Sequence, residues 1–185
     1  MTVAPLLVAF AGADAGRWRI TSARTLIGPP LPAASHIAIS EGTPPALPSN
    51  RTFALRGVVG NLRYTNRSER DGLAAIQAGL ARPQATRAAL IPIRKTPAWW
   101  ALAQDERRAI FEEQSRHIGI GMAHLPAIAR RLHHARELGE PFDFVTWFEY
   151  APEDEASFEA LLASLRATPE WAYIDREIDI RLART

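Results

Sequence analysis

The residues best suited to chemistry lie between positions 91 and 130, in the stretch IPIRKTPAWWALAQDERRAIFEEQSRHIGIGMAHLPAIAR. This stretch holds His117, Arg130 and Lys95, which is the only lysine in a chain with 22 lysines and arginines. A neutral histidine can bind a metal ion, and an arginine in an apolar pocket can bind an anion. Together these residues indicate a metal cofactor that acts on a small, negatively charged substrate.

His117 has two interpretations. It follows a predicted helix and precedes the glycines of HIGIG, so its imidazole could simply bind the last carbonyls of that helix. The functional interpretation is an axial haem ligand, because the glycines let a planar macrocycle approach and haem iron takes a neutral imidazole. The second ring nitrogen then needs a carboxylate or carbonyl partner. Glu170 in TPEW is a candidate, although an acid after a proline is more often a turn residue.

The other polar and aromatic candidates each have two interpretations as well. Lys95 follows the apolar run IPIR, so it is either a solvated strand end or a cation beside the cofactor. Trp99 and Trp100 either pack in the core or line a flat apolar macrocycle. On a helix, Arg131 would lie nearer the apolar face than Arg130 does. Helical periodicity therefore does not select Arg130 as the anion-binding residue.

Several classes of site are excluded by what the sequence lacks. It contains no cysteine, which rules out disulfides, thiolate ligation of haem and cysteine-based metal clusters. The HExxH, GxSxG, Walker and dinucleotide-binding signatures are absent. His133 and His134 would point apart on a helix, so a joint metal site is not expected there.

Charge and hydropathy narrow the choice of partners. The net charge is +2 and the arginine pairs are isolated, so no surface for nucleic acid is expected. No apolar run approaches the length of a membrane span. The N-terminal run LLVAF is short and no basic residue precedes it, so it predicts a strand rather than a signal peptide. These features favour a cytoplasmic protein.

The pattern of apolar and polar residues predicts the strands and helices that carry the candidate residues. Apolar and β-branched runs predict strands at 6–11, 18–22, 36–39, 52–65, 88–94, 142–150 and 173–182. Helices are predicted at 68–80, 97–116, 126–138 and 154–166. Thr96 and Pro97 form a clear start for the second helix, as N-cap and first helical residue.

The strands alternate between apolar and polar residues, which favours an α+β fold with antiparallel sheets covered by helices on one face. We expect a single unit, 1–185, built from two ferredoxin-like halves that form a dimeric α+β barrel. The predicted boundaries are a reduced N-terminal half at 1–84 and a cofactor-binding C-terminal half at 85–185. No internal sequence repeat supports this division.

The runs IPIRKTPAWW, RHIGIG, LPAIARRLHHARELGEPFDF and TWFEY are similar to those of the chlorite dismutases. These are haem b enzymes that convert chlorite to chloride and dioxygen. The resemblance extends from about residue 57 to the C-terminus. It implies that His117 is the proximal iron ligand and Arg130 the distal arginine, with Lys95 and Glu170 in the proximal hydrogen-bond network.

Further haem contacts are expected from the resemblance, from strand alternation and from a polar residue in an apolar run. The resemblance places Ile91, Trp99 and Trp100 at the macrocycle. The GNLRYT run is similar to the strand on the propionate side in the family, which adds Asn61 and Tyr64. Thr146 and Phe148 alternate on one strand and would wall the distal side. Gln77 in AAIQAGL would orient Arg130, unless it only marks the edge of a helix.

The function implied by the resemblance is haem-dependent decomposition of chlorite, with Arg130 holding the anion near the iron. Because the shorter chains of the family are dimeric, a homodimer is also implied. Coprohaem decarboxylases share the fold but usually lack the distal arginine, and no motif of the dye-decolourising peroxidases is found. The alternatives are a haem peroxidase, a coprohaem- or porphyrin-handling protein of the same superfamily, and a non-catalytic haem-binding dimer.

Overall fold

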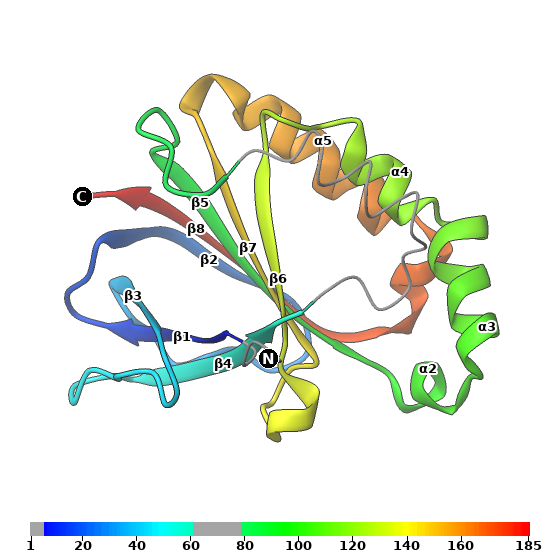
Figure 1. Ribbon diagram of the computed structural model, residues 1–185, viewed down its shortest axis with the longest axis horizontal. Coiled ribbons are helices and arrows are strands. Elements are labelled where there is room, and N and C mark those ends of the chain that lie inside the picture. The colour runs from blue at the N-terminus through cyan, green and yellow to red at the C-terminus, as the bar shows by residue number, and fades with distance from the viewer. Residues whose placement is uncertain (1–5, 61–78) are drawn as a thin grey trace, which may run out of the picture.

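The computed structural model describes residues 6–60 and 79–185, in which antiparallel strands close a barrel and helices lie against one side of it (Figure 1). The first part of the chain gives four strands at the predicted positions: β1 (Leu7–Ala13), β2 (Trp18–Ile27), β3 (His36–Glu41) and β4 (Phe53–Val59). The predicted end of the fourth strand, and most of the predicted helix at 68–80, lie outside the described residues.

The second part of the chain supplies four more strands: β5 (Arg87–Lys95), β6 (Ala129–His134), β7 (Phe144–Tyr150) and β8 (Ile174–Arg184). The connection from β5 to β6 is helical: α2 (Pro97–Ala101), α3 (Gln104–Arg108), the π-helix η1 (Ala109–Gln114) and α4 (His117–Met122). Helix α5 (Glu155–Arg166) joins β7 to β8, and short 3₁₀ turns complete the path: η2 (Arg136–Leu138), η3 (Pro152–Asp154) and η4 (Pro169–Tyr173).

The strand order of the barrel is β1-β3-β2-β8-β5-β7-β6-β4, and β4 pairs with β1 to close it. In the second part the order β8-β5-β7-β6, with helices between β5 and β6 and between β7 and β8, is that of a ferredoxin-like unit. The first part has the equivalent order β4-β1-β3-β2, but its connections at 14–17 and 42–52 contain no helix. The expected α+β fold with antiparallel sheets is confirmed.

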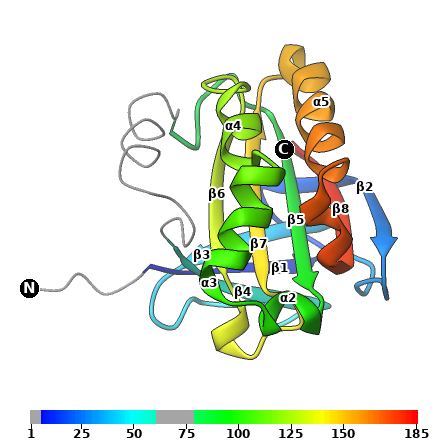
Figure 2. The same cartoon turned by 90° about the vertical axis from the view of Figure 1, so that its right-hand side faces the viewer.

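The central strands bury both of their faces, and this creates two separate apolar layers. Inside the barrel, side chains such as Leu90 and Trp147 pack with Phe10. On the outer face, Ile91 and Phe148 pack with a stripe of helix α5. Figure 2 shows α3, α4 and α5 lying in front of the sheet of β6, β7, β5 and β8. Among the described residues, helices therefore cover only the outer face of this sheet.

The helix predicted at 126–138 is wrong, because residues 129–134 form the strand β6. Ala, Arg and Leu favour a helix, but β6 pairs with β7 over its whole length and with β4 at its end. Closure of the barrel outweighs the local propensity of these residues. As a consequence, Arg130 and Arg131 point to opposite faces of a sheet instead of lying side by side on a helix.

The helix predicted at 97–116 is interrupted rather than continuous. Thr96 caps α2 as predicted, and its side-chain oxygen accepts a hydrogen bond from Trp99 N. The chain then breaks at 102–103, and a π-helix occupies the last predicted turns. His117 does not end this helix but begins the next, so the glycines that follow it lie inside α4.

Within the described residues, no helix is both long and apolar enough to cross a bilayer. The cytoplasmic location stays a prediction.

Candidate active site

A cavity of about 300 Å³ lies between the outer face of the sheet and the helices that cover it. Strand alternation explains its floor, because residues two apart on one strand share a face. The register places side chains of three neighbouring strands in rows across that face: Ile91 and Ile93 of β5, Phe144, Thr146 and Phe148 of β7, and Arg130, Leu132 and His134 of β6. The floor is therefore mainly apolar, with a guanidinium and an imidazole at the ends of its β6 row.

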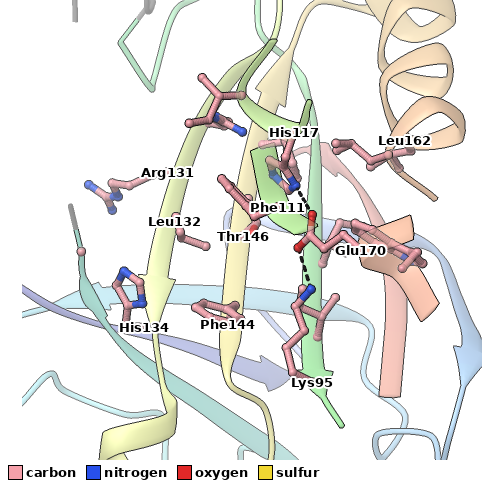
Figure 3. A pocket seen from close by; sticks show the side chains of 18 of the residues that line it. Lys95, Phe111, His117, Arg131, Leu132, His134, Phe144, Thr146, Leu162 and Glu170 are labelled. Atoms are coloured by element: carbon pink, nitrogen blue, oxygen red, sulfur yellow. Dashed lines mark hydrogen bonds and ion pairs between the residues drawn. The ribbon is translucent and has the colours of Figure 1, made fainter. Parts of the chain in front are cut away.

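His117, Glu170 and Lys95 form a hydrogen-bonded chain at the helical side of the cavity (Figure 3). The His117 Nδ1–H donates to Glu170 Oε2 at 2.7 Å. Lys95 Nζ donates to the other carboxylate oxygen, Oε1, at 2.6 Å. This arrangement keeps the proton on Nδ1 and leaves Nε2 as a lone-pair donor, which is the form in which histidine binds metals.

The carboxylate of Glu170 is ionised although its side chain is only 3% exposed. Burial alone would raise the pKa of Glu170, but His117 and Lys95 together lower it to about 2. Burial lowers the pKa of Lys95, and the neighbouring carboxylates Glu170 and Asp143 oppose that effect. Lys95 Nζ also lies 4.3 Å from the centroid of the Trp99 ring, an additional cation–π contact.

The short helices before His117 fix the plane and position of its imidazole. Phe111, on the π-helix η1, stacks on the His117 ring with centroids 4.4 Å apart and an interplanar angle of 24°. Arg116 then adopts a left-handed conformation, with φ of 50°, which turns the chain into α4. The backbone N–H of Ile118, in the first turn of α4, donates to Glu112 Oε2 at 2.8 Å. Stacking and the Glu170 hydrogen bond hold the His117 ring directly, and this cap fixes the first turn of α4, on which His117 lies.

Arg130 lies on the cavity face of β6, opposite Phe148 on β7. Desolvation lowers the pKa of its guanidinium, although the group remains charged at any working pH. Arg131 also lines the cavity, but its side chain extends away from His117 to the other side of β6, as Figure 3 shows. There it pairs with Glu41 at 2.5 Å and donates from Nε to His133 Nε2 at 3.3 Å. Strand alternation therefore places Arg130, rather than Arg131, on the floor of the cavity.

The structure brings most of the predicted site residues together. In addition to His117, Lys95, Glu170 and Arg130, the cavity surface includes four expected residues: Ile91, Trp99, Thr146 and Phe148. Trp100 is not among the lining residues: its indole N–H donates to Asp143 and its ring stacks on Phe144. Asn61, Tyr64 and Gln77 lie outside the described residues.

Other residues of the cavity were missed from the sequence. Phe111 precedes His117 by six residues, a spacing that does not pair side chains on an α-helix. The π-helix and the left-handed turn at Arg116 together bring the two rings into contact. The helix expected at 126–138 gives no reason to place His134 at the site, whereas strand alternation from Arg130 places it on the same face. Leu162 and Leu165 belong to an apolar stripe of α5 that lines the cavity as well as packing the core.

Comparison with known proteins gives consistent matches. The family model described as chlorite dismutase matches residues 52–185. The crystal structure of a dimeric chlorite dismutase from Nitrobacter winogradskyi is 55% identical, with a TM-score of 0.89 over 96% of this chain and 99% of that one. A chlorite dismutase from Ideonella dechloratans is 29% identical over 127 residues, which are 68% of this chain but only 42% of that longer protein.

A more distant match agrees on the fold alone. A variant of the chlorite dismutase from Candidatus Nitrospira defluvii has a TM-score of 0.68 over all of this chain and 93% of that one, at 19% identity. Its similarity extends through the first four strands, beyond the residues matched by the family model.

Proposed function

This chain belongs to the chlorite dismutase family, and from that premise we propose that it decomposes chlorite to chloride and dioxygen with a haem b group bound in the cavity. The observation that carries the proposal is the position of two groups in one apolar cavity. His117 offers a lone pair from Nε2, and Arg130 offers a desolvated positive charge. These are the metal-binding and anion-binding groups that such a reaction requires.

The residues present fit haem better than a bare metal ion. Within the described part of the chain, no three side chains of His, Cys, Asp or Glu gather in a way that could hold an ion. A single histidine suffices for haem, because the macrocycle supplies four nitrogen ligands of its own. The apolar floor of the cavity suits a flat aromatic group.

The proximal residues would act on the iron through His117. Glu170 accepts the Nδ1 proton of the imidazole, which gives the ligand more anionic character and fixes its orientation. Lys95 holds the second oxygen of the same carboxylate, so Glu170 cannot rotate away from His117. Haem bound here would supply an iron centre able to exchange oxygen and electrons with chlorite.

Arg130 would bind the substrate. A guanidinium that is largely removed from solvent forms strong charge-assisted hydrogen bonds with a small oxyanion. It can hold chlorite near the iron and retain a chlorine oxyanion until the two oxygen atoms are joined. The net reaction converts one chlorite into one chloride and one dioxygen, and it consumes no proton or external electron. A side chain that never loses its proton is therefore suited to this role.

Oxygen release from the haem-loaded protein tests the proposal. With chlorite in an oxygen electrode, we expect about one dioxygen for each chlorite consumed. Arg130→Ala should reduce kcat/KM at least about tenfold, because it removes a charge-assisted hydrogen bond. Arg131→Ala is the matched comparison, since that guanidinium is held by Glu41 and extends away from His117. Haem binding without oxygen release, or equal losses in the two variants, would refute the proposal.

We further propose a homodimer, because the Nitrobacter relative that this chain matches along nearly its whole length is described as dimeric. Within each protomer, 85–185 would be the haem-binding half, since nearly all cavity residues belong to it. Residues 1–84 would be the reduced half. Sedimentation of the loaded protein tests the dimer.

A further inference from the structure

Helix α4 contains two glycines with different surroundings. A Cβ added at Gly121 would lie 3.1 Å from Nη1, 3.3 Å from Cζ and 3.5 Å from Nη2 of Arg130. A Cβ added at Gly119 would meet only the Cβ of Arg116, at 4.0 Å. Gly121 is buried, whereas Gly119 is exposed. The two positions therefore form a natural pair, one beside the cavity arginine and one away from it.

The three distances at Gly121 define the orientation of the Arg130 guanidinium relative to α4. Because they are similar, the planar group lies across the space that a side chain at 121 would occupy. Contacts of 3.0 to 3.4 Å are tighter than a Cβ normally makes, so a methyl group at 121 would require the guanidinium to shift away from α4 by a few tenths of an ångström. Arg130 comes from β6, so this contact fixes the arginine of the sheet against the helix that carries His117.

We propose that Gly121 is a positioning residue: it sets the resting place of the Arg130 guanidinium and, through it, the affinity of the site for small anions. The inference rests on the proposed role of Arg130. A guanidinium that already occupies its binding position does not have to reorganise when the anion arrives, and this preorganisation strengthens binding. His117 and Gly121 are four residues apart on α4. One short helix therefore controls both the metal ligand and the anion-binding group.

The test is fluoride binding to the ferric, haem-loaded protein, followed by its optical spectrum, which reports anion affinity separately from turnover. Gly121→Ala should weaken fluoride binding about three- to tenfold, because a displaced guanidinium loses part of a charge-assisted hydrogen bond. Gly119→Ala should leave the affinity within about twofold, since the same change is made on the exposed side of the same helix.

A double-variant cycle shows whether Gly121 acts through Arg130. In an Arg130→Ala background the Gly121→Ala substitution should no longer change fluoride affinity, because the group it displaces is gone. The inference is overturned if Gly121→Ala behaves like Gly119→Ala, or if its effect persists without Arg130. If Gly121→Ala fails to fold, the double variant Gly121→Ala/Arg130→Ala should fold. Without the guanidinium there is no clash at position 121, and alanine is a better helix former than glycine. A double variant that also fails would refute the inference.

The outcomes separate this inference from the proposed function. A fluoride cycle with the expected coupling, in a protein that releases no oxygen from chlorite, would refute the reaction and support the role of Gly121. Oxygen release from chlorite without coupling between the two substitutions would support the reaction and refute the role of Gly121.

Discussion

Glu170 is the residue on which the properties of the candidate iron ligand depend. Its two carboxylate oxygens accept hydrogen bonds from His117 and Lys95. Because only 3% of the Glu170 side chain is exposed, water could not replace either partner. We predict that Glu170→Gln raises the reduction potential of the bound haem by roughly 60 mV or more, a tenfold change in a one-electron equilibrium. The reason is that an amide takes less proton density from Nδ1, so the imidazole donates less to ferric iron.

Spectroelectrochemical titration of the haem-loaded variant measures this shift. Glu149→Gln is the control, because Glu149 is also a buried carboxylate and accepts hydrogen bonds from Trp147 and from the backbone of Ala81, away from the cavity. Equal potentials for the two variants would show that the carboxylate of Glu170 does not act on the iron.

At the scale of an element, the turn between η1 and α4 determines how His117 enters the cavity. Arg116 has a φ of 50°, a left-handed conformation that costs a residue with a side chain roughly 1–2 kcal/mol. We predict that Arg116→Gly stabilises the protein by about 1 kcal/mol, because glycine adopts this conformation without steric cost. Urea unfolding should show a higher midpoint at an unchanged slope.

The control for this prediction lies in the neighbouring helix. Glu113 is exposed within η1 and has an ordinary negative φ, so Glu113→Gly should destabilise the protein by about 1 kcal/mol. If both glycines destabilise the protein, then the left-handed turn at Arg116 carries no steric cost and the prediction is wrong.

The same elements show what sequence alone can predict. The strands β5 and β7 and the helix α5 were predicted nearly to their ends, because their patterns are strong and their partners agree with them. β6 was predicted as a helix, since its pairing with β7 and β4 is tertiary information that local propensity does not contain. Periodicity alone could not choose between Arg130 and Arg131, and the error about β6 is the reason.

The pairing of His117 with Glu170 marks another limit. These residues are 53 positions apart, so the residues alone make Glu170 one weak candidate partner, and the resemblance to the chlorite dismutases is what favours it. The distance, the burial and the second bond to Lys95 could come only from the structure. Phe111 was missed for a different reason, because a π-helix changes the spacing on which helical patterns depend.

For the whole molecule, the two faces of the central sheet have different roles: one lines the candidate site and the other packs the core of the barrel. The outer face forms the floor of the cavity, and the barrel interior holds His133 of β6, which is fully buried. Its Nδ1–H donates to the Val145 carbonyl at 2.8 Å, and its ring lies edge-on to Phe10 at 4.9 Å. Desolvation lowers the pKa of His133 from 6.5 to about 4, so the folded barrel holds this imidazole neutral.

This buried histidine predicts how the stability of the molecule depends on pH. Between pH 6.5 and about 4, the unfolded chain binds a proton at position 133 and the folded chain does not. The free energy of unfolding should therefore fall by roughly 3 kcal/mol in total as the pH drops through this window, at 1.36 kcal/mol for each unit of pKa shift. Below pH 4.5 the loss continues from Glu170, whose folded pKa of about 2 is also depressed.

Urea unfolding at several pH values separates the contribution of His133 from that of Glu170. The comparison is between the unmodified protein and His133→Asn. Asparagine can keep a donor near the Val145 carbonyl but has no group that titrates. The variant should be less stable at neutral pH, since it loses ring packing against Phe10, yet its stability should change little between pH 6.5 and 4.5. Below that range both proteins should lose stability together, because the carboxylate of Glu170 is common to them. An equally steep fall in both proteins above pH 4.5 would mean that groups other than His133 cause the acid sensitivity of the barrel.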